Sequence, residues 1–113
     1  MPSVSVIIVN YHGLEDTIAC VQSLQTSRNT ENLKIIVVNA DDDSAERSKS
    51  TQVLQDQFPK IEILERKNLG FSGGNNEGAA YTLQNHNPEY LLFLNNDTRV
   101  DPSAIHELVS FAH

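Results

Sequence analysis

The sequence predicts an α/β protein with a Rossmann-like parallel sheet of about four strands and flanking helices. Four short apolar segments alternate along the chain with four segments in which apolar residues recur at helical spacing. The first apolar segment, residues 4–9, is rich in β-branched residues and almost unbroken, as expected of a strand buried on both faces. Strands that alternate with helices of this length pair in parallel through right-handed crossovers.

The first half of the chain is expected to supply two strands and two helices. After the strand at residues 4–9, residues 14–25 show helical spacing, with acidic residues in the first turn near the positive end of the helix dipole. Residues 33–38 form the second strand. The second helix begins after Asp43, which has a glutamate three residues further on as in a capping box, and Pro59 ends it.

The second half repeats this alternation. A third, shorter strand is expected at residues 61–64 and a fourth at residues 90–94. Between them a glycine-rich loop, residues 68–78, leads into a helix. Asp101 is expected to cap the last helix, with Pro102 at its first position. The apolar stripe of that helix consists of Ile105, Leu108, Val109 and Ala112.

Length and composition exclude several classes of protein. The chain of 113 residues has room for one domain, and a net charge of −7 argues against nucleic acid as a partner. A nucleotide stays compatible, because a metal ion and backbone N–H groups can hold its phosphates. Cys20 is the one cysteine and is interpreted as a reduced thiol on a helix. No signal peptide or bilayer-spanning run is found, so a cytoplasmic protein is expected.

Polar residues follow the predicted strands where ligands are expected. In an open parallel sheet, ligands bind outside the carboxyl ends of the strands. These ends are residues 10–12, 39–43, 65–70 and 95–97, and three of the four carry polar side chains suited to a ligand.

The clearest candidate for a ligand site among these ends is the segment Asn95, Asn96 and Asp97, directly after an apolar strand. Carboxylate and amide oxygens are the ligands that Mg²⁺ and Mn²⁺ prefer. The spacing alone leaves two interpretations open, a metal site or an ordinary turn, because Asn and Asp also occur at turns and caps.

The glycine-rich segment also has two interpretations. Glycines let the backbone approach a ligand closely or take positive φ angles, and the helix that follows offers free N–H groups to an anion. The segment is neither a Walker loop nor a dinucleotide fingerprint, because the required spacing is absent. Taken alone it would be a plain flexible loop.

Other polar clusters are assigned ordinary roles. The acidic run at residues 41–43 is interpreted as a solvated face that ends in the helix cap. The four histidines show no metal-site spacing; they are His12, His86, His106 and His113. His12 lies at the mouth of the predicted site and is interpreted as a loop residue. No Ser-His-Asp or Cys-His arrangement can be assembled.

Four segments occur in a characteristic order: residues 4–11 (VSVIIVNY), 35–38 (IIVV), 68–75 (NLGFSGGN) and 92–100 (LFLNNDTRV). Together they resemble family 2 glycosyltransferases of the GT-A fold, in particular the rhamnosyltransferase-like branch, over nearly the whole chain. That family transfers a sugar from a nucleoside diphosphate to an acceptor hydroxyl, usually with inversion. The resemblance implies that residues 1–113 are the nucleotide-sugar (donor) binding part of such an enzyme.

The resemblance also implies roles for individual residues. Asp97 is the implied ligand of the divalent metal, Mg²⁺ or Mn²⁺, that bridges the diphosphate, and Asn96 faces the ribose or the diphosphate. The segment at residues 9–11 borders the nucleobase. The implied substrate-binding residues are Val9, Asn10, Tyr11, Asn39, Asp41, Gly70, Gly73, Asn75, Asn95 and Asn96.

This chain departs from the family pattern in two places. After the second strand the family usually has an Asp-Asp or Asp-Asn pair, one acid of which commonly contacts the nucleobase. Here Asn39 and Ala40 precede Asp41, so Asp41 is expected to substitute in that contact. The chain also stops before the segment that carries the acceptor site, so the general base is expected beyond residue 113. In the full-length protein we expect a saccharide or lipid-linked acceptor at the inner face of the membrane. The face left open is expected to make the isolated chain associate with itself near the fourth strand and the last helix.

Two alternatives stay open. A non-catalytic nucleotide-sugar-binding module or fragment would fit the altered segment at Asn39 and Ala40. A doubly wound signalling or interaction domain would fit the order of elements. A receiver-like module of that kind would carry an acidic pair after its first strand, where this chain has Asn10, Tyr11 and His12.

Overall fold

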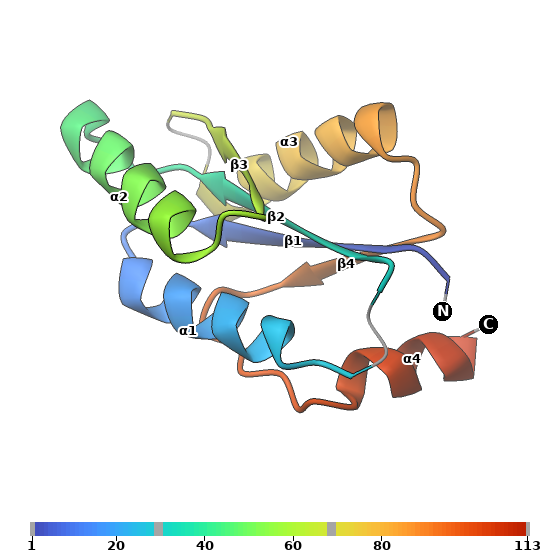
Figure 1. Cartoon of the computed structure of the whole chain (residues 1–113). Helices are drawn as coiled ribbons and strands as arrows, with labels where there is room; N and C mark the ends of the chain where they lie inside the picture. Colours follow the sequence, from blue (N-terminus) through green and yellow to red (C-terminus); the bar gives the residue numbers. More distant parts are fainter. Residues whose placement is uncertain (1, 29–30, 68–69, 113) are drawn as a thin grey trace.

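Strands and helices alternate along the chain as predicted (Figure 1). The computed structural model describes residues 2–28, 31–67 and 70–112, except for the side chains of Gly70 and Phe71. The third strand begins and ends one residue later than the predicted 61–64. The elements are β1 (Val4–Asn10), α1 (Leu14–Gln25), β2 (Leu33–Asn39), α2 (Ser44–Gln57), β3 (Glu62–Glu65), α3 (Gly70–Asn85), β4 (Tyr90–Leu94) and α4 (Ala104–Ala112).

The four strands form one parallel sheet in the order β3-β2-β1-β4, which confirms the predicted fold class. All seven residues of β1 are buried, as its unbroken apolar sequence predicts. From β1 the chain adds β2 and β3 on one side and then returns to add β4 on the other. The strand order therefore reverses between β1 and β4, and in open α/β sheets ligands bind outside the carboxyl ends of the strands at such a point.

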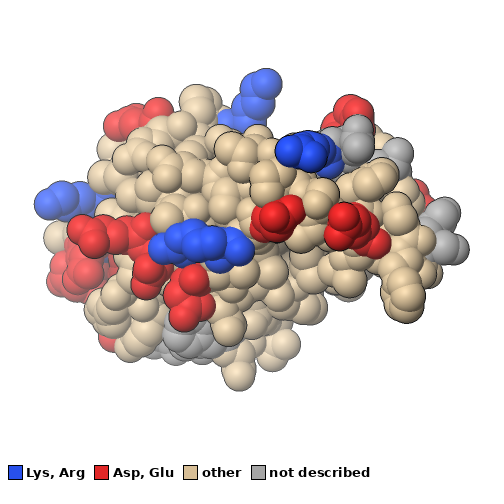
Figure 2. All heavy atoms as spheres, turned by 90° about the horizontal axis from the view of Figure 1, so that it is seen from below, with Lys and Arg blue, Asp and Glu red and all other residues tan. Residues whose placement is uncertain are grey.

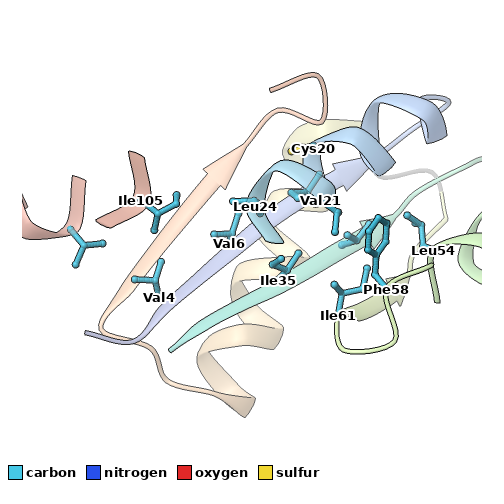
Figure 3. Close-up of a cluster of buried hydrophobic side chains, with 13 residues drawn as sticks. Val4, Val6, Cys20, Val21, Leu24, Ile35, Leu54, Phe58, Ile61 and Ile105 are labelled. Atoms are coloured by element: carbon cyan, nitrogen blue, oxygen red, sulfur yellow. The ribbon is translucent and has the colours of Figure 1, made fainter. Parts of the chain in front are cut away.

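The helices cover the two faces of the sheet unequally. On one face Val6 of β1 packs in a cluster with Leu24 of α1, Leu54 of α2 and Ile105 of α4 (Figure 3). On the other face Ile7 of β1 belongs to a separate cluster, and the helix that packs there is α3. Right-handed crossovers explain this division, because a crossover that runs in the opposite direction along the sheet places its helix on the opposite face.

The glycine-rich segment is helical, so the predicted loop is wrong for residues 70–78, while residues 68 and 69 lie outside the described residues. A Cβ atom on Gly74 would lie 2.8 Å from both Cγ atoms of Val9. A Cβ atom on Gly78 would lie 2.6 Å from Cγ2 of Ile7. Because no such contact is sterically acceptable, α3 reaches its position over β1 only with glycine at these two places.

The last helix begins later than predicted. α4 starts at Ala104, so Pro102 lies in the turn before the helix instead of at its first position. The Asp101 carboxylate accepts hydrogen bonds from the backbone N–H of Ser103 at 3.0 Å and from its hydroxyl at 2.9 Å. These bonds lower the pKa of Asp101. They also close a local turn that takes the place of a helical first turn.

Several apolar side chains near β4 and α4 are exposed. Leu108 and Ala112 face solvent, whereas the other two residues of the predicted stripe are buried. Phe111 is 93% exposed, and Phe93 on the edge strand β4 is 48% exposed. Self-association through this surface stays a prediction. Among the helices in the described residues, none has the length and apolar content that a membrane span requires.

The contact of α3 with β1 gives a first prediction. Alanine in place of a helical glycine normally stabilises a protein by about 0.5–1 kcal/mol. Gly78→Ala should instead lower the free energy of unfolding by about 1–3 kcal/mol, because its methyl group would overlap the buried side chains of Ile7 and Val38. Urea denaturation followed by circular dichroism measures the change. Asn76→Ala, at an exposed position of the same helix, is the control and should not destabilise the protein. A stabilised Gly78→Ala variant would contradict the close packing of α3.

Candidate functional site

The parallel sheet brings most of the predicted site residues to one edge. Asn10 ends β1 and Asn39 ends β2, and the two residues are partners in the sheet register. Leu94, the last residue of β4, lies beside Ile8 of β1, so residues 95–97 follow at the same edge. Acidic side chains gather at this end of the molecule on the face shown in Figure 2, the end to which the strands point in Figure 1.

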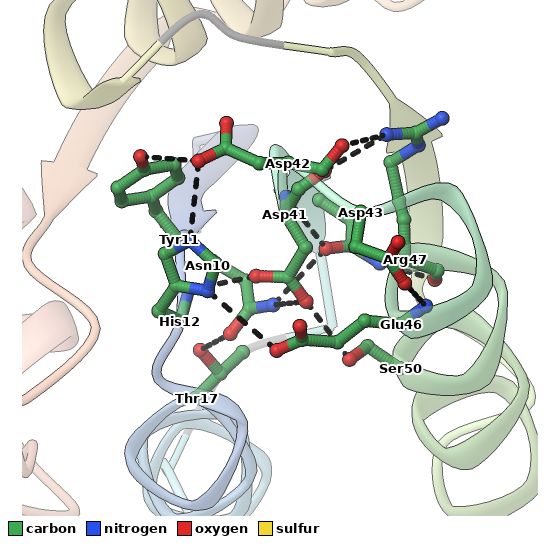
Figure 4. A network of polar contacts seen from close by, with 11 residues as sticks. Asn10, Tyr11, His12, Thr17, Asp41, Asp42, Asp43, Glu46, Arg47 and Ser50 are labelled. Atoms are coloured by element: carbon green, nitrogen blue, oxygen red, sulfur yellow. Dashed lines mark hydrogen bonds and ion pairs between the residues drawn. The ribbon is translucent and has the colours of Figure 1, made fainter.

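A buried carboxylate lies at the centre of this edge. Asp41 is 1% exposed, so the interpretation of the acidic run as a solvated face is wrong for this residue. Its Oδ1 accepts a hydrogen bond from the backbone N–H of His12 at 2.7 Å, and its Oδ2 accepts from the Ser50 hydroxyl at 2.9 Å and from Asn10 Nδ2 at 3.3 Å (Figure 4). Three donors from β1, the loop after it and α2 therefore satisfy one buried charge.

Asn10 and Asn39 continue this network. Asn10 Nδ2 also donates to Asn39 Oδ1 at 3.0 Å, and Asn10 Oδ1 accepts from the Thr17 hydroxyl of α1 at 2.7 Å. Asn39 Nδ2 donates to the Arg47 carbonyl at 2.9 Å and to the Thr51 hydroxyl at 3.0 Å. Both asparagines are fully buried. Their side chains join the ends of β1 and β2 to the first turns of α1 and α2.

The loop after β4 is held by α1. Asn96 is 8% exposed, and its Nδ2 donates to the Gly13 carbonyl and to the Thr17 hydroxyl, each at 3.2 Å. A Cβ atom on Gly13 would lie 2.5 Å from Asn96 Nδ2, so this contact depends on glycine. The Cys20 thiol donates to the Asn95 carbonyl at 3.9 Å. Cys20 is a free, buried cysteine on α1, as predicted, and burial raises its pKa to about 11.

Asp97 is exposed in this loop, on the β4 side of the point where the strand order reverses. The turn that carries it is closed by a hydrogen bond of 3.0 Å from the Thr98 N–H to the Asn95 carbonyl. The neighbouring Arg99 pairs with Asp16 at 3.2 Å and not with Asp97. Within residues 2–28, 31–67 and 70–112 the Asp97 carboxylate has no hydrogen-bond or ion-pair partner. A free carboxylate in this position fits the requirements of a divalent cation.

A second polar layer lies outside Asp41, where α2 begins. Asp42 accepts a hydrogen bond from the Tyr11 hydroxyl at 2.7 Å, and His12 Nε2 lies 3.3 Å from the same oxygen. These two hydrogen bonds lower the pKa of Asp42, and the bond to Asp42 raises the pKa of His12. His12 Nδ1 lies 3.5 Å from Glu46 Oε1. His12 has a φ of 54°, an uncommon backbone conformation that the bond to Asp41 helps to hold.

The predicted residues of α3 are placed differently. Gly70 is the first residue of α3 and Gly73 lies in its first turn. The Oδ1 atom of Asn75 is buried without a hydrogen-bond partner among the described residues. Val9 is 1% exposed and packs in the sheet core, so its side chain lies in the interior.

Sequence reasoning missed the partners of Asp41 and the contacts of His12. Ser50 and Thr17 carry no signal of their own, because small hydroxyl residues are common in helices. One signal was present: Asp43 starts α2, as confirmed by a hydrogen bond of 2.9 Å from the Glu46 N–H to its carboxylate. This cap fixes the start of α2, and Glu46 in the first turn of the helix then lies near His12, in the loop after β1.

Comparisons with known proteins identify the class. The model of the family described as glycosyl transferase family 2 matches residues 5–113, so the chain belongs to that family. This result confirms the resemblance found in the sequence and sets aside a signalling domain. The rhamnosyltransferase-like branch stays a prediction. Among curated proteins no significant match is found.

Solved structures share the fold at low sequence identity. Residues 1–349 of S. aureus TarS give a TM-score of 0.68 at 20% identity, over 96% of this chain and 32% of that one. The same part of TarS in complex with UDP gives a TM-score of 0.66 at 22% identity, over 96% of this chain and 31% of that one. Mannosyltransferase PcManGT from Pyrobaculum calidifontis, in complex with GDP-Man and Mn²⁺, gives a TM-score of 0.61 at 13% identity. The match covers 85% of this chain and 28% of that one. The chain thus spans about a third of the length of these proteins or less.

The network around Asp41 gives a second prediction. In Asp41→Asn the new NH2 group donates where an oxygen accepted, so at least one buried donor loses its partner. The free energy of unfolding should fall by about 1–3 kcal/mol, measured by urea denaturation. Asp42→Asn is the matched control, because the Asp42 side chain is 44% exposed; its effect should stay within about 0.5 kcal/mol. Equal losses in the two variants would show that the burial of Asp41 does not matter for stability.

Proposed function

We propose that this chain is the donor-binding part of a glycosyltransferase that moves a sugar, with inversion, from a nucleoside diphosphate to an acceptor hydroxyl. Family membership supports a glycosyltransferase. Two of the structures with this fold are complexes with UDP and with GDP-Man and Mn²⁺, which supports a nucleoside-diphosphate sugar as the ligand. The edge where strand order reverses is the place where such a ligand binds in open α/β sheets.

The observation that carries this proposal is the free carboxylate of Asp97. It follows the end of β4, where the strand order reverses, and has no partner among the described residues. We assign Asp97 as a ligand of a divalent metal, Mg²⁺ or Mn²⁺. Such an ion, when bound, neutralises the charge that develops on the diphosphate leaving group. Asn95, exposed on the same turn, is assigned to the diphosphate side of the site.

The other predicted residues divide into two groups by their contacts. Asn10, Asn39 and Asn96 have buried side chains bonded to protein groups, so we assign them to holding the site in shape. Tyr11 is partly exposed at the end of β1 and is assigned to the nucleobase side. Asn75 has a buried oxygen without a partner in the described residues, and we assign it as an acceptor for a ligand hydroxyl.

Acceptor chemistry is assigned to a part of the protein outside residues 1–113. We expect the general base there, together with the site for a saccharide or lipid-linked acceptor, in a cytoplasmic enzyme at the inner face of the membrane. A second candidate function is a non-catalytic nucleotide-sugar-binding module. It is favoured by Asn39 and Ala40, which stand where the family has an acidic pair and are both fully buried.

A third prediction tests the metal role of Asp97. Asp97→Ala should weaken the binding of UDP or dTDP in the presence of Mn²⁺ by at least about tenfold, because the one charged ligand of the motif is lost. Calorimetry with and without EDTA measures this effect. Asp56→Asn is the control: this exposed acid lies in the last turn of α2, which runs away from the carboxyl edge. Equal binding in EDTA, or unchanged binding by Asp97→Ala, would contradict the assignment.

A fourth prediction separates donor binding from transfer. The 113-residue chain should bind the nucleotide but transfer no sugar, because general acid–base help is worth about 10²–10⁴-fold in rate and no base is assigned within it. Transfer from a radiolabelled nucleotide sugar measures the rate, and a longer form of the protein is the comparison. Equal rates for the two forms would place the catalytic residues within this chain.

A further inference from the structure

We propose that His12, Asp41 and Glu46 form a cation site separate from Asp97, selective for zinc or a similar transition-metal ion. The three residues come from the loop after β1, the end of β2 and the first turn of α2. One ligand atom from each residue lies within 4.8 Å of the others. This inference concerns the metal alone and does not depend on the proposed function.

The spacing of the ligand atoms suits a small metal ion better than a direct ion pair. Bonds of about 2.0–2.2 Å at tetrahedral angles place two ligands about 3.4 Å apart. His12 Nδ1 and Glu46 Oε1 are 3.5 Å apart. A charge-assisted N–H···O bond between them would be about 2.7–2.9 Å long. The third ligand needs a shift of about 1 Å or a little more, and the half-exposed side chains of His12 and Glu46 can supply it.

The surroundings of the three ligands resemble those of metal sites. A metal-ligating histidine commonly donates its other ring N–H to a carboxylate. Here His12 Nε2 faces Asp42, which also accepts a hydrogen bond from the Tyr11 hydroxyl, and Nδ1 is left to face Glu46. Asp41 accepts from three donors, whereas a carboxylate offers about four acceptor positions, so one position is open to a metal.

The charge around the site is negative and only partly balanced. Three carboxylates, those of Asp41, Asp42 and Glu46, face one histidine. Arg47 does not neutralise them directly, because its NH1 donates to the backbone carbonyls of Asp41 and Asp42, at 2.8 and 3.5 Å.

A groove gives access to the ligands. It has a volume of about 490 Å³, and His12, Asp41 and Glu46 line it together with Lys49 and acidic residues of α1. Figure 4 shows Glu46 reaching from α2 towards His12. This space admits the water ligands that would complete the coordination of a metal.

The ligand set determines which metal is preferred. Imidazole suits Zn²⁺ and other transition metals, whereas Mg²⁺ prefers sites made of oxygen atoms alone. Zn²⁺ also binds mixed nitrogen and oxygen sites more tightly than Mn²⁺ does. We therefore expect Zn²⁺ to prefer the site of His12 over that of Asp97, where the motif offers only oxygen ligands.

Calorimetric titration with Zn²⁺ alone tests the inference in the 113-residue Asp97→Ala chain, without nucleotide. One Zn²⁺ should bind per chain, and Mg²⁺ should not compete. His12→Ala and Glu46→Gln should each weaken Zn²⁺ binding by at least about tenfold. His106→Ala on α4 and His86→Ala at the opposite edge of the sheet are the controls and should bind as before. Because His12 and Glu46 are half-exposed, both variants should fold, and circular dichroism checks this.

A second measurement follows the ligands directly. Adding Zn²⁺ should shift the NMR signals of the His12 ring while those of His106 stay in place. Absence of Zn²⁺ binding, unchanged binding by both His12→Ala and Glu46→Gln, or loss of binding in His86→Ala instead would each overturn the inference. These outcomes leave the role of Asp97 untouched, because that residue is already removed from the titrated protein.

Discussion

The Asp41 carboxylate is almost completely buried, and the arrangement of the candidate site depends on how its charge is satisfied. Its donors come from the end of β1, the loop after β1 and α2. These hydrogen bonds tie α2 to the end of β1 and help to hold His12 in its unusual backbone conformation. Asn10 and Thr17 then extend the network to α1, and Asn96 extends it to the loop after β4. One buried charge thus sets the relative positions of four chain segments at the carboxyl edge of the sheet.

Close packing on the opposite face imposes a second constraint. α3 is the described helix that covers this face, and it lies over β1 only because Gly74 and Gly78 have no side chain. The same contact brings the first turns of α3 to the carboxyl edge, where Asn75 has a buried oxygen without a partner among the described residues. The glycines therefore act on the site through packing. Their effect is to place a helix where the sequence predicts a loop over residues 68–78.

Features that depend on neighbours in the sequence were predictable. The unbroken apolar run of β1 and the Asp43 cap of α2 follow from local patterns, and both are confirmed. Features that depend on partners distant in the sequence were not predictable. The helical state of the glycine-rich segment requires Ile7 and Val9 as its packing surface. The burial of Asp41 requires Ser50 from the next helix, and the backbone conformation of His12 depends on its bond to Asp41. Parallel pairing brings such residues together in space, whereas their spacing along the chain does not indicate which of them will meet.

Consecutive residues of the loop after β4 have different surroundings: Asn96 is buried and bonded to Thr17 of α1, whereas Asp97 is exposed to solvent. A ligand on an unattached loop loses conformational entropy when it binds, and this loss weakens affinity. Here the loop is already immobilised by the Asn96 amide and by the contact of Cys20 with the Asn95 carbonyl. The entropy of ordering Asp97 is therefore lost during folding and not during binding. The cation proposed to bind at Asp97 would therefore gain affinity from residues of α1 that never touch the ion.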